Sequence, residues 1–191
     1  MGTWKFDPMH TQVEFSAKHL GMMTVRGHFN EVTARGEIYP DQPERSNVEA
    51  TINTASIRTH NEIRDNDLRS SNFLEVAKYP TITFKSTRVE HAGGDRYKVT
   101  GDLTVKDTTR PVTLELVKYG EFNDPRMGHR IGYAAQTRIN RKDFGMNFNA
   151  VLDGKFVVSD EIQINIEGEV LEAADEPLAD MQPQEAGRKT R

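Results

Sequence analysis

The sequence predicts an all-β protein: an antiparallel, eight-stranded β-barrel with a short helical segment near residues 60–75. Three observations predict it. Polar and apolar residues alternate with period two in stretch after stretch, which is typical of half-buried strands. Turn-forming residues separate these stretches. Helical periodicity is absent from most of the chain, and the region around residues 60–75 is the main stretch without alternation.

The alternation starts at Val13, where Val13, Phe15, Ala17 and His19 share one face of the first predicted strand. The alternating stretches are 13–19, 23–29, 32–38, 48–53, 82–85, 97–105, 112–116, 131–140 and 162–170. The apolar parity changes between the second and third stretches. This slip predicts a bulge or a sharp bend near Asn30 and Glu31, a device that barrel strands often carry.

Short turns rich in Pro, Gly, Asp and Asn divide the stretches, at residues 39–41, 92–95, 106–111 and 123–125. Connections this short favour antiparallel pairing of consecutive strands.

Residues 60–74 are rich in charge and predict one or two short helices. Their expected buried side consists of Ile63, Leu68, Phe73 and Leu74, and the helix is expected to cap one end of the barrel. From about Glu172 the chain turns polar. We therefore expect one domain over residues 1–171 and a disordered tail over residues 172–191.

Composition excludes several classes of protein. The net charge of -4, from 29 acidic and 25 basic residues, lacks the basic excess of a nucleic-acid binder. The chain has no cysteine, which excludes disulfides and thiolate chemistry. It holds no apolar stretch long enough to span a membrane and no signal peptide, so a cytoplasmic location is expected, or a periplasmic one if the chain was trimmed.

The pattern also predicts what lies inside. Charged residues on the outward face exclude a membrane barrel, so the apolar face points inward. That face mixes large residues with small ones, among them Ala17, Ala50, Gly101 and Ala135. Eight strands enclose a lumen that side chains can just fill, or that holds one small ligand. The residues alone leave both outcomes open.

Several motifs, in order along the chain, resemble those of the YceI-like family. They are 4–15, 19–21, 25–29, 64–74, 78–84, 99–107, 109–112 and 140–146. The resemblance runs from about Trp4 to Val170. It implies a bacterial protein with a lipocalin-like barrel, often dimeric, whose pocket takes a polyisoprenoid or another long-chain amphipathic lipid.

Parity and resemblance together predict the ligand-binding residues. They are Phe15, His19, Val25, Phe29, Ile52, Arg64, Leu68, Phe73, Phe84, Leu103, Leu114, Tyr133, Phe144 and Met146. For each apolar residue the alternative is ordinary core packing.

Basic residues near the helical segment, Arg58, Arg64 and Arg69, have the guanidinium fork that suits a phosphate or carboxylate head group. A solvated helix face is the favoured interpretation. His10, His19 and His60 would have to meet to hold a metal ion, and their spacing does not favour one, so no metal and no cofactor is expected. Asn72, Asn140, Arg141 and Asp143 are expected to fix turns.

The leading hypothesis is therefore a carrier or store for an isoprenoid-type lipid and not an enzyme, because no nucleophile motif or phosphate-binding glycine loop occurs. The alternative is a metal-dependent or small-molecule enzyme, or stress protein, that uses the same cavity. A third hypothesis is a filled barrel that serves as an interaction module.

Overall fold

A computed structural model describes residues 4–172 of the chain. Its elements are β1 (Trp4–His19), β2 (Met23–Phe29), β3 (Val32–Glu37), β4 (Asn47–Asn53), β5 (Ile57–Arg58), α1 (Glu62–Arg69), β6 (Thr81–His91), β7 (Arg96–Val105), β8 (Thr108–Asp124), β9 (Gly128–Asn140), β10 (Val151–Leu152), β11 (Lys155–Phe156) and β12 (Glu161–Glu172). Short 3-10 turns lie at Pro43–Arg45, Thr54–Ser56 and Arg141–Phe144. The predicted tail, apart from Glu172, lies outside the described residues.

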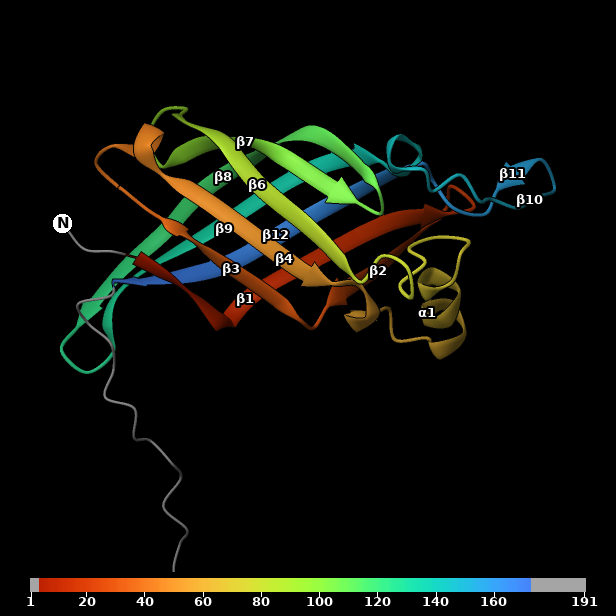
Figure 1. Ribbon diagram of the computed structural model, residues 1–191, viewed down its shortest axis with the longest axis horizontal. Helices are drawn as coiled ribbons and strands as arrows, with labels where there is room; N and C mark the ends of the chain where they lie inside the picture. Colours follow the sequence, from red (N-terminus) through yellow and green to blue (C-terminus); the bar gives the residue numbers. More distant parts are fainter. Residues whose placement is uncertain (1–3, 173–191) are drawn as a thin grey trace, which may run out of the picture.

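One antiparallel sheet forms the body of the molecule. Its strands lie in the order β3-β4-β6-β7-β8-β9-β12-β1-β2-β5, and β10 pairs with β11 in a separate two-stranded sheet. The large sheet curls into a half-barrel, with α1 and the β10–β11 hairpin at one end (Figure 1). The all-β class and the antiparallel pairing of consecutive strands are thereby confirmed.

The expected closed, eight-stranded barrel is not what forms. The hydrogen-bonded sheet has ten strands and ends at β3 and β5, without a ladder between these edges in the part of the chain described. β1 is also longer than the alternating stretch 13–19 from which it was predicted, and a bulge explains why. The β1–β12 register shifts between Phe6 and Thr11, so the alternation of β1 is legible only from Val13 onward.

The bend at Asn30 and Glu31 is where the sequence predicted it. Up to Phe29, β2 pairs with β1, and from Val32, β3 pairs with β4. Backbone hydrogen bonds anchor the bend, because Asn30 N donates to Ser56 O (3.2 Å) and Asn53 N donates to Glu31 O (3.0 Å). The parity slip therefore marks the point where the chain exchanges one neighbouring strand for another.

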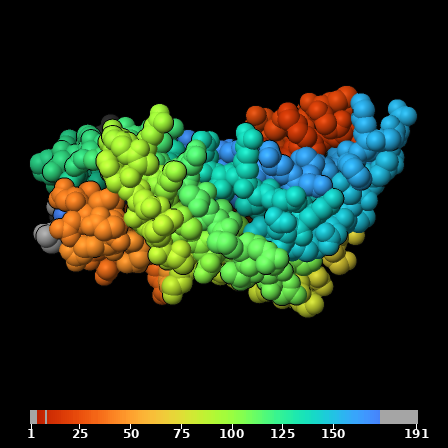
Figure 2. All heavy atoms as spheres, turned by 90° about the horizontal axis from the view of Figure 1, so that it is seen from above, coloured from red at the N-terminus to blue at the C-terminus, as the bar shows by residue number. Residues whose placement is uncertain are grey.

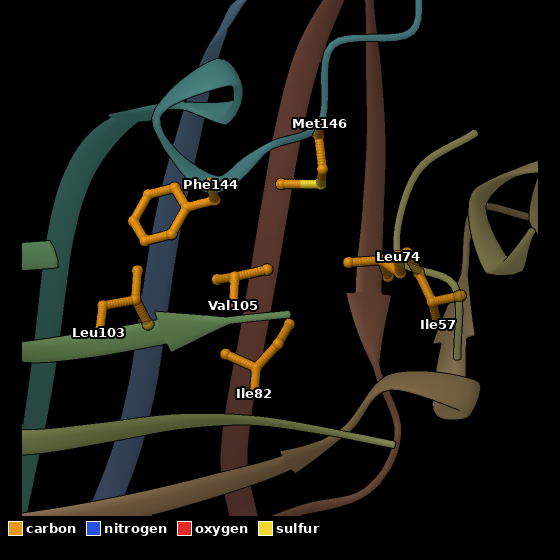
Figure 3. Packing of buried hydrophobic residues seen from close by; sticks show 7 residues of the cluster. All are labelled: Ile57, Leu74, Ile82, Leu103, Val105, Phe144 and Met146. Carbon is orange, nitrogen blue, oxygen red and sulfur yellow. The ribbon is translucent and has the colours of Figure 1, made fainter. Parts of the chain in front are cut away.

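Two hydrophobic clusters are buried inside the half-barrel. The larger one lies toward the α1 end and consists of Ile57, Leu74, Ile82, Leu103, Val105, Phe144 and Met146 (Figure 3). The smaller one joins Trp4 of β1, Ile131 of β9 and Val170 of β12. Each cluster draws residues from strands far apart in sequence, so the two hold the curl of the sheet.

The helical segment forms one short helix. Asn61 caps α1, since its side-chain oxygen accepts a hydrogen bond from Arg64 N (3.0 Å). Phe73 and Leu74 are buried and Leu68 is half-buried, as predicted. Ile63 was wrongly predicted, because 84% of it is exposed. Among the described residues, no helix is long and apolar enough to cross a membrane.

Gly101 of β7 lies opposite Ser86 of β6. A Cβ built there would lie 2.5 Å from both the Lys85 carbonyl oxygen and Cζ of Phe84. Gly101→Ala is therefore expected to lower the free energy of unfolding by about 1–3 kcal/mol, as overpacking does.

Urea denaturation measures this change, and Gly132→Ala in β9 is the matched control. A Cβ at Gly132 meets nothing within 4 Å, so this control is expected to keep or slightly raise stability. Equal effects of the two substitutions would contradict the assigned contact.

Candidate ligand-binding cavity

A cavity of about 350 Å³ lies inside the half-barrel, within the size range of small-molecule sites. Its walls come from the inward faces of the sheet strands, together with residues from the α1 region and the loop before β4. Backbone polar groups in these strands are paired in the ladders, so the wall can be apolar without leaving orphaned donors.

Most of the predicted ligand-binding residues line this cavity. They are Phe15, Phe29, Ile52, Leu68, Phe73, Phe84, Leu103, Leu114, Tyr133 and Met146. Phe15 and Phe29 also contact each other, with ring centroids 5.6 Å apart. The structure thus brings these side chains together, while their role in binding a ligand stays a prediction.

Four predicted residues lie elsewhere. His19 is exposed at the end of β1, with Nδ1 3.1 Å from the Val157 carbonyl oxygen. Val25 is half-buried on β2 but does not belong to the cavity wall. Phe144 packs in the larger cluster with 2% exposure, again outside the cavity wall.

Arg64, the fourth, does not reach the cavity either. Its Nε donates to Thr59 Oγ1 and its Nη2 to Thr59 O, both at 2.8 Å. Arg69 likewise donates to the carbonyl oxygens of Ala55 (3.1 Å) and Ile57 (2.8 Å). Both guanidinium groups hold the loop around α1, where buried Asp65 also accepts from Thr59 N at 2.8 Å.

Arg141 is a wall residue that the sequence did not predict. Only 2% of it is exposed, and it lies directly after β9. Its donors contact Ser159 O (3.1 Å), Met146 O (2.5 Å), Phe148 O (2.8 Å) and Asp160 Oδ1 (3.1 Å). Burial lowers the pKa of this guanidinium from its usual value, and Asp160 opposes that shift. Its hydrogen bonds close a loop, the structural role expected for this turn.

The expected turn role also holds for Asn140, whose Oδ1 accepts from Lys142 N at 3.0 Å. Asn72 instead donates from its side chain to Asp67 Oδ1 at 2.7 Å. Sequence reasoning also missed the far end of the cavity. There Tyr39, Pro40 and Pro43 join the wall, in the loop that follows the alternating stretch 32–38, whose last residue Ile38 is also a wall residue.

The histidines do not assemble a metal site from His10, His19 and His60. His10 and His19 lie nine residues apart on one strand, which at about 3.3 Å per residue separates them by roughly 30 Å. His60 instead packs against His28, with ring centroids 5.6 Å apart.

His10 has acidic neighbours of its own. One ligand atom each of Asp7, His10 and Glu169 lies within 4.8 Å of the others. However, Arg130 Nη1 already bonds Asp7 Oδ2 (2.7 Å) and Glu169 Oε2 (3.0 Å). Burial raises the pKa of Asp7, but hydrogen bonds from Arg130 and His10 outweigh it and lower the pKa to about 2. The positively charged guanidinium of Arg130 therefore already occupies the position between the two carboxylates.

Comparison with known proteins identifies a family model and relatives that match most of this chain. A model of the YceI-like domain matches residues 4–170. A UPF0312 protein from Pseudomonas paraeruginosa is 38% identical over 159 residues, which cover 83% of this chain and 81% of that protein.

Solved structures share the fold. The crystal structure of Burkholderia cenocepacia BcnA has a TM-score of 0.76 at 23% identity and covers 86% of this chain and 99% of its own. A polyisoprenoid binding domain from Saccharophagus degradans, implicated in plant cell wall breakdown, has a TM-score of 0.63 at 13% identity, over 90% and 99% of the two chains.

The pKa of Tyr133 tests whether this part of the cavity excludes water. Burial, and to a smaller extent the neighbouring Tyr97 and Glu121, raise the pKa of Tyr133 to about 12. An unfolded tyrosine ionises near pH 10, so folding stability from the neutral phenol is present below pH 10 and is lost as pH rises through about 12.

Ultraviolet titration should therefore show one tyrosine ionising late, and Tyr133→Phe should remove that step. Tyr119→Phe, at a position 72% exposed, is the control and should leave the late step intact. A late step that survives in Tyr133→Phe would belong to another tyrosine and would contradict the raised pKa assigned to Tyr133.

Proposed function

This chain belongs to the YceI-like family, and we propose that it binds a polyisoprenoid or another long-chain amphipathic lipid in its cavity, as a carrier or store. The observation that carries the proposal is the composition of the cavity wall. The wall is formed almost wholly by aliphatic and aromatic side chains from strands all round the half-barrel.

Such a wall suits a hydrocarbon chain. Each buried methylene contributes roughly 0.8 kcal/mol, so a dozen carbons supply about 10 kcal/mol before the costs of ordering the chain. The few polar wall residues include Tyr133 and Arg141, and Arg141 makes four hydrogen bonds to the protein's own oxygens. Selectivity in this cavity therefore rests on apolar shape.

The similar structure from Saccharophagus degradans is a polyisoprenoid binding domain, which supports the choice of a polyisoprenoid as the ligand class. At 13% identity the likeness shows the fold alone, so the ligand of this chain remains our proposal. We also propose that two copies of the chain associate and that the protein is located in the cytoplasm. The mass of the protein in solution tests whether it is a dimer.

Binding is favoured over catalysis. Among the described wall residues Glu14 is the one acid and Arg141 the one base, Glu14 is exposed, and the wall includes no histidine or cysteine. A nucleophile within hydrogen-bond reach of a base, which the enzyme alternative requires, is therefore not found in this wall.

Native mass spectrometry tests the proposal directly. Wild-type protein purified without detergent and mixed with a prenyl alcohol should gain the mass of one ligand. Ala50→Phe should reduce that uptake at least tenfold, because Ala50 lines the cavity and a phenyl ring would occupy it.

Thr51→Phe is the matched control, since Thr51 is the next residue of β4 and is exposed. It should bind as the wild type does. A wild-type protein that stays at its unliganded mass with every prenyl lipid tested would sink the proposal.

A second pair of substitutions separates the cavity from the core. Phe84→Ala should weaken lipid uptake several-fold, because half-buried Phe84 lines the cavity. Phe144→Ala should cost about 3–5 kcal/mol of stability, as for a fully buried ring, but should leave the affinity of the folded protein unchanged.

Thermal melting and mass spectrometry of the two variants measure both effects. If Phe144→Ala impaired uptake as much as Phe84→Ala does, the cavity wall would be wrongly assigned.

A further inference from the structure

Large apolar side chains are exposed together at the α1 end of the molecule. We define the tip patch as Met22, Met23, Phe148, Val151, Leu152 and Phe156. Each is between 44% and 68% exposed, although a soluble surface normally scatters such residues singly. They lie at the β1–β2 turn, up to the first residue of β2, and on the β10–β11 hairpin with the loop that precedes it.

Backbone hydrogen bonds hold these two turns side by side. Leu20 N donates to Val157 O (3.1 Å), and Ser159 N donates to Lys18 O (2.9 Å). Figure 2 shows the result, with the light-blue hairpin projecting from the right-hand end beside the red end of β1. The tip patch is therefore a fixed surface of the fold.

The tip patch is continuous with the cavity. The ring of Phe148 packs edge-on against the ring of Phe73, with centroids 5.6 Å apart, and Phe73 lines the cavity. Val158, two residues after Phe156, also lines it. Apolar side-chain contacts thus link the tip patch to the cavity wall.

Cationic side chains accompany the exposed rings. Lys142 Nζ lies 5.8 Å from the centroid of Phe156 and also pairs with Asp160 Oδ2 at 2.8 Å, while exposed Lys155 immediately precedes Phe156 on β11. Lysines beside exposed apolar residues suit a lipid interface, where the stem contacts apolar groups and the ammonium remains among anionic head groups.

The opposite end of the molecule lacks this combination. Tyr119, Phe122 and Met127 are exposed on β8 and the β8–β9 turn, but none of them lines the cavity. No ring contact links them to a wall residue in the described part of the chain. Exposure alone thus does not distinguish the two ends, whereas continuity with the cavity does.

We propose that the tip patch docks the protein onto a phospholipid bilayer that contains anionic lipid, and that apolar cargo passes between bilayer and cavity at this end. The cargo step rests on the proposed lipid-binding function, while the docking surface stands on its own geometry. The two turns insert their apolar side chains at the level of the head groups, and the lysines remain at the surface.

Vesicle sedimentation tests the docking. Wild-type protein should sediment with vesicles of equal parts phosphatidylcholine and phosphatidylglycerol. The triple variant M23Q/L152Q/F156Q should partition at least about tenfold more weakly, because burial of three apolar side chains is lost. Its exposed positions leave the fold intact, which circular dichroism verifies.

The control is Y119Q/F122Q/M127Q, which removes as many apolar residues from the other end and should sediment as the wild type does. Docking is overturned if the wild type stays in solution, if the tip-patch variant binds equally well, or if the control loses as much. It is also overturned if light scattering shows that the tip-patch variant halves the mass of the wild type, because two copies would then cover the patch.

Uptake of free farnesol, followed by native mass spectrometry, separates this proposal from the previous one. The tip-patch variant should take up farnesol as well as the wild type does, which supports a role in docking alone. A wild-type protein that binds vesicles but takes up no prenyl ligand would support the docking surface and overturn the lipid-binding function.

Discussion

The inward face of the curled sheet carries very few groups that can form hydrogen bonds, and the rest of the structure depends on this. Every second residue of each long strand points inward. Between the edge strands β3 and β5, backbone donors and acceptors are paired in the ladders, so this part of the interior needs no polar side chain or water to satisfy them. Two clusters fill part of the interior, one around Trp4, Ile131 and Val170 and the other toward α1. Tyr133 lies in this interior, and burial raises the pKa of its hydroxyl to about 12.

Strand alternation predicted this interior well, because side-chain parity is a local property. It located β7 and β9 almost to their ends, and it located the bend before Val32. It missed the first half of β1, where the ladder register shifts, and the β10–β11 hairpin, which is too short to alternate. Closure of the sheet depends on how distant strands meet, so counting strands could not decide it.

The charged residues were harder to interpret, because a sequence does not show which oxygen a guanidinium meets. Arg64 and Arg69 were candidates for a ligand head group, yet both donate to carbonyl oxygens of the loop around α1. Arg141 lay within a family motif, but its burial follows from a loop that folds back over it. His10 and His19 share one strand, and distance along that strand already separates them.

The hydrogen-bonded ladder of the large sheet stops at β3, and this affects how the sheet closes on that side. β3 runs on from β2 after the bend, yet in the sheet it pairs with β4 alone. Ile38, directly after β3, packs against the Trp4 cluster through its side chain. Separating this seam breaks van der Waals contacts while sparing every backbone bond of the sheet. On this side the half-barrel is therefore closed by side-chain packing around Trp4 rather than by a hydrogen-bond ladder, so a substitution in that cluster acts on the seam directly.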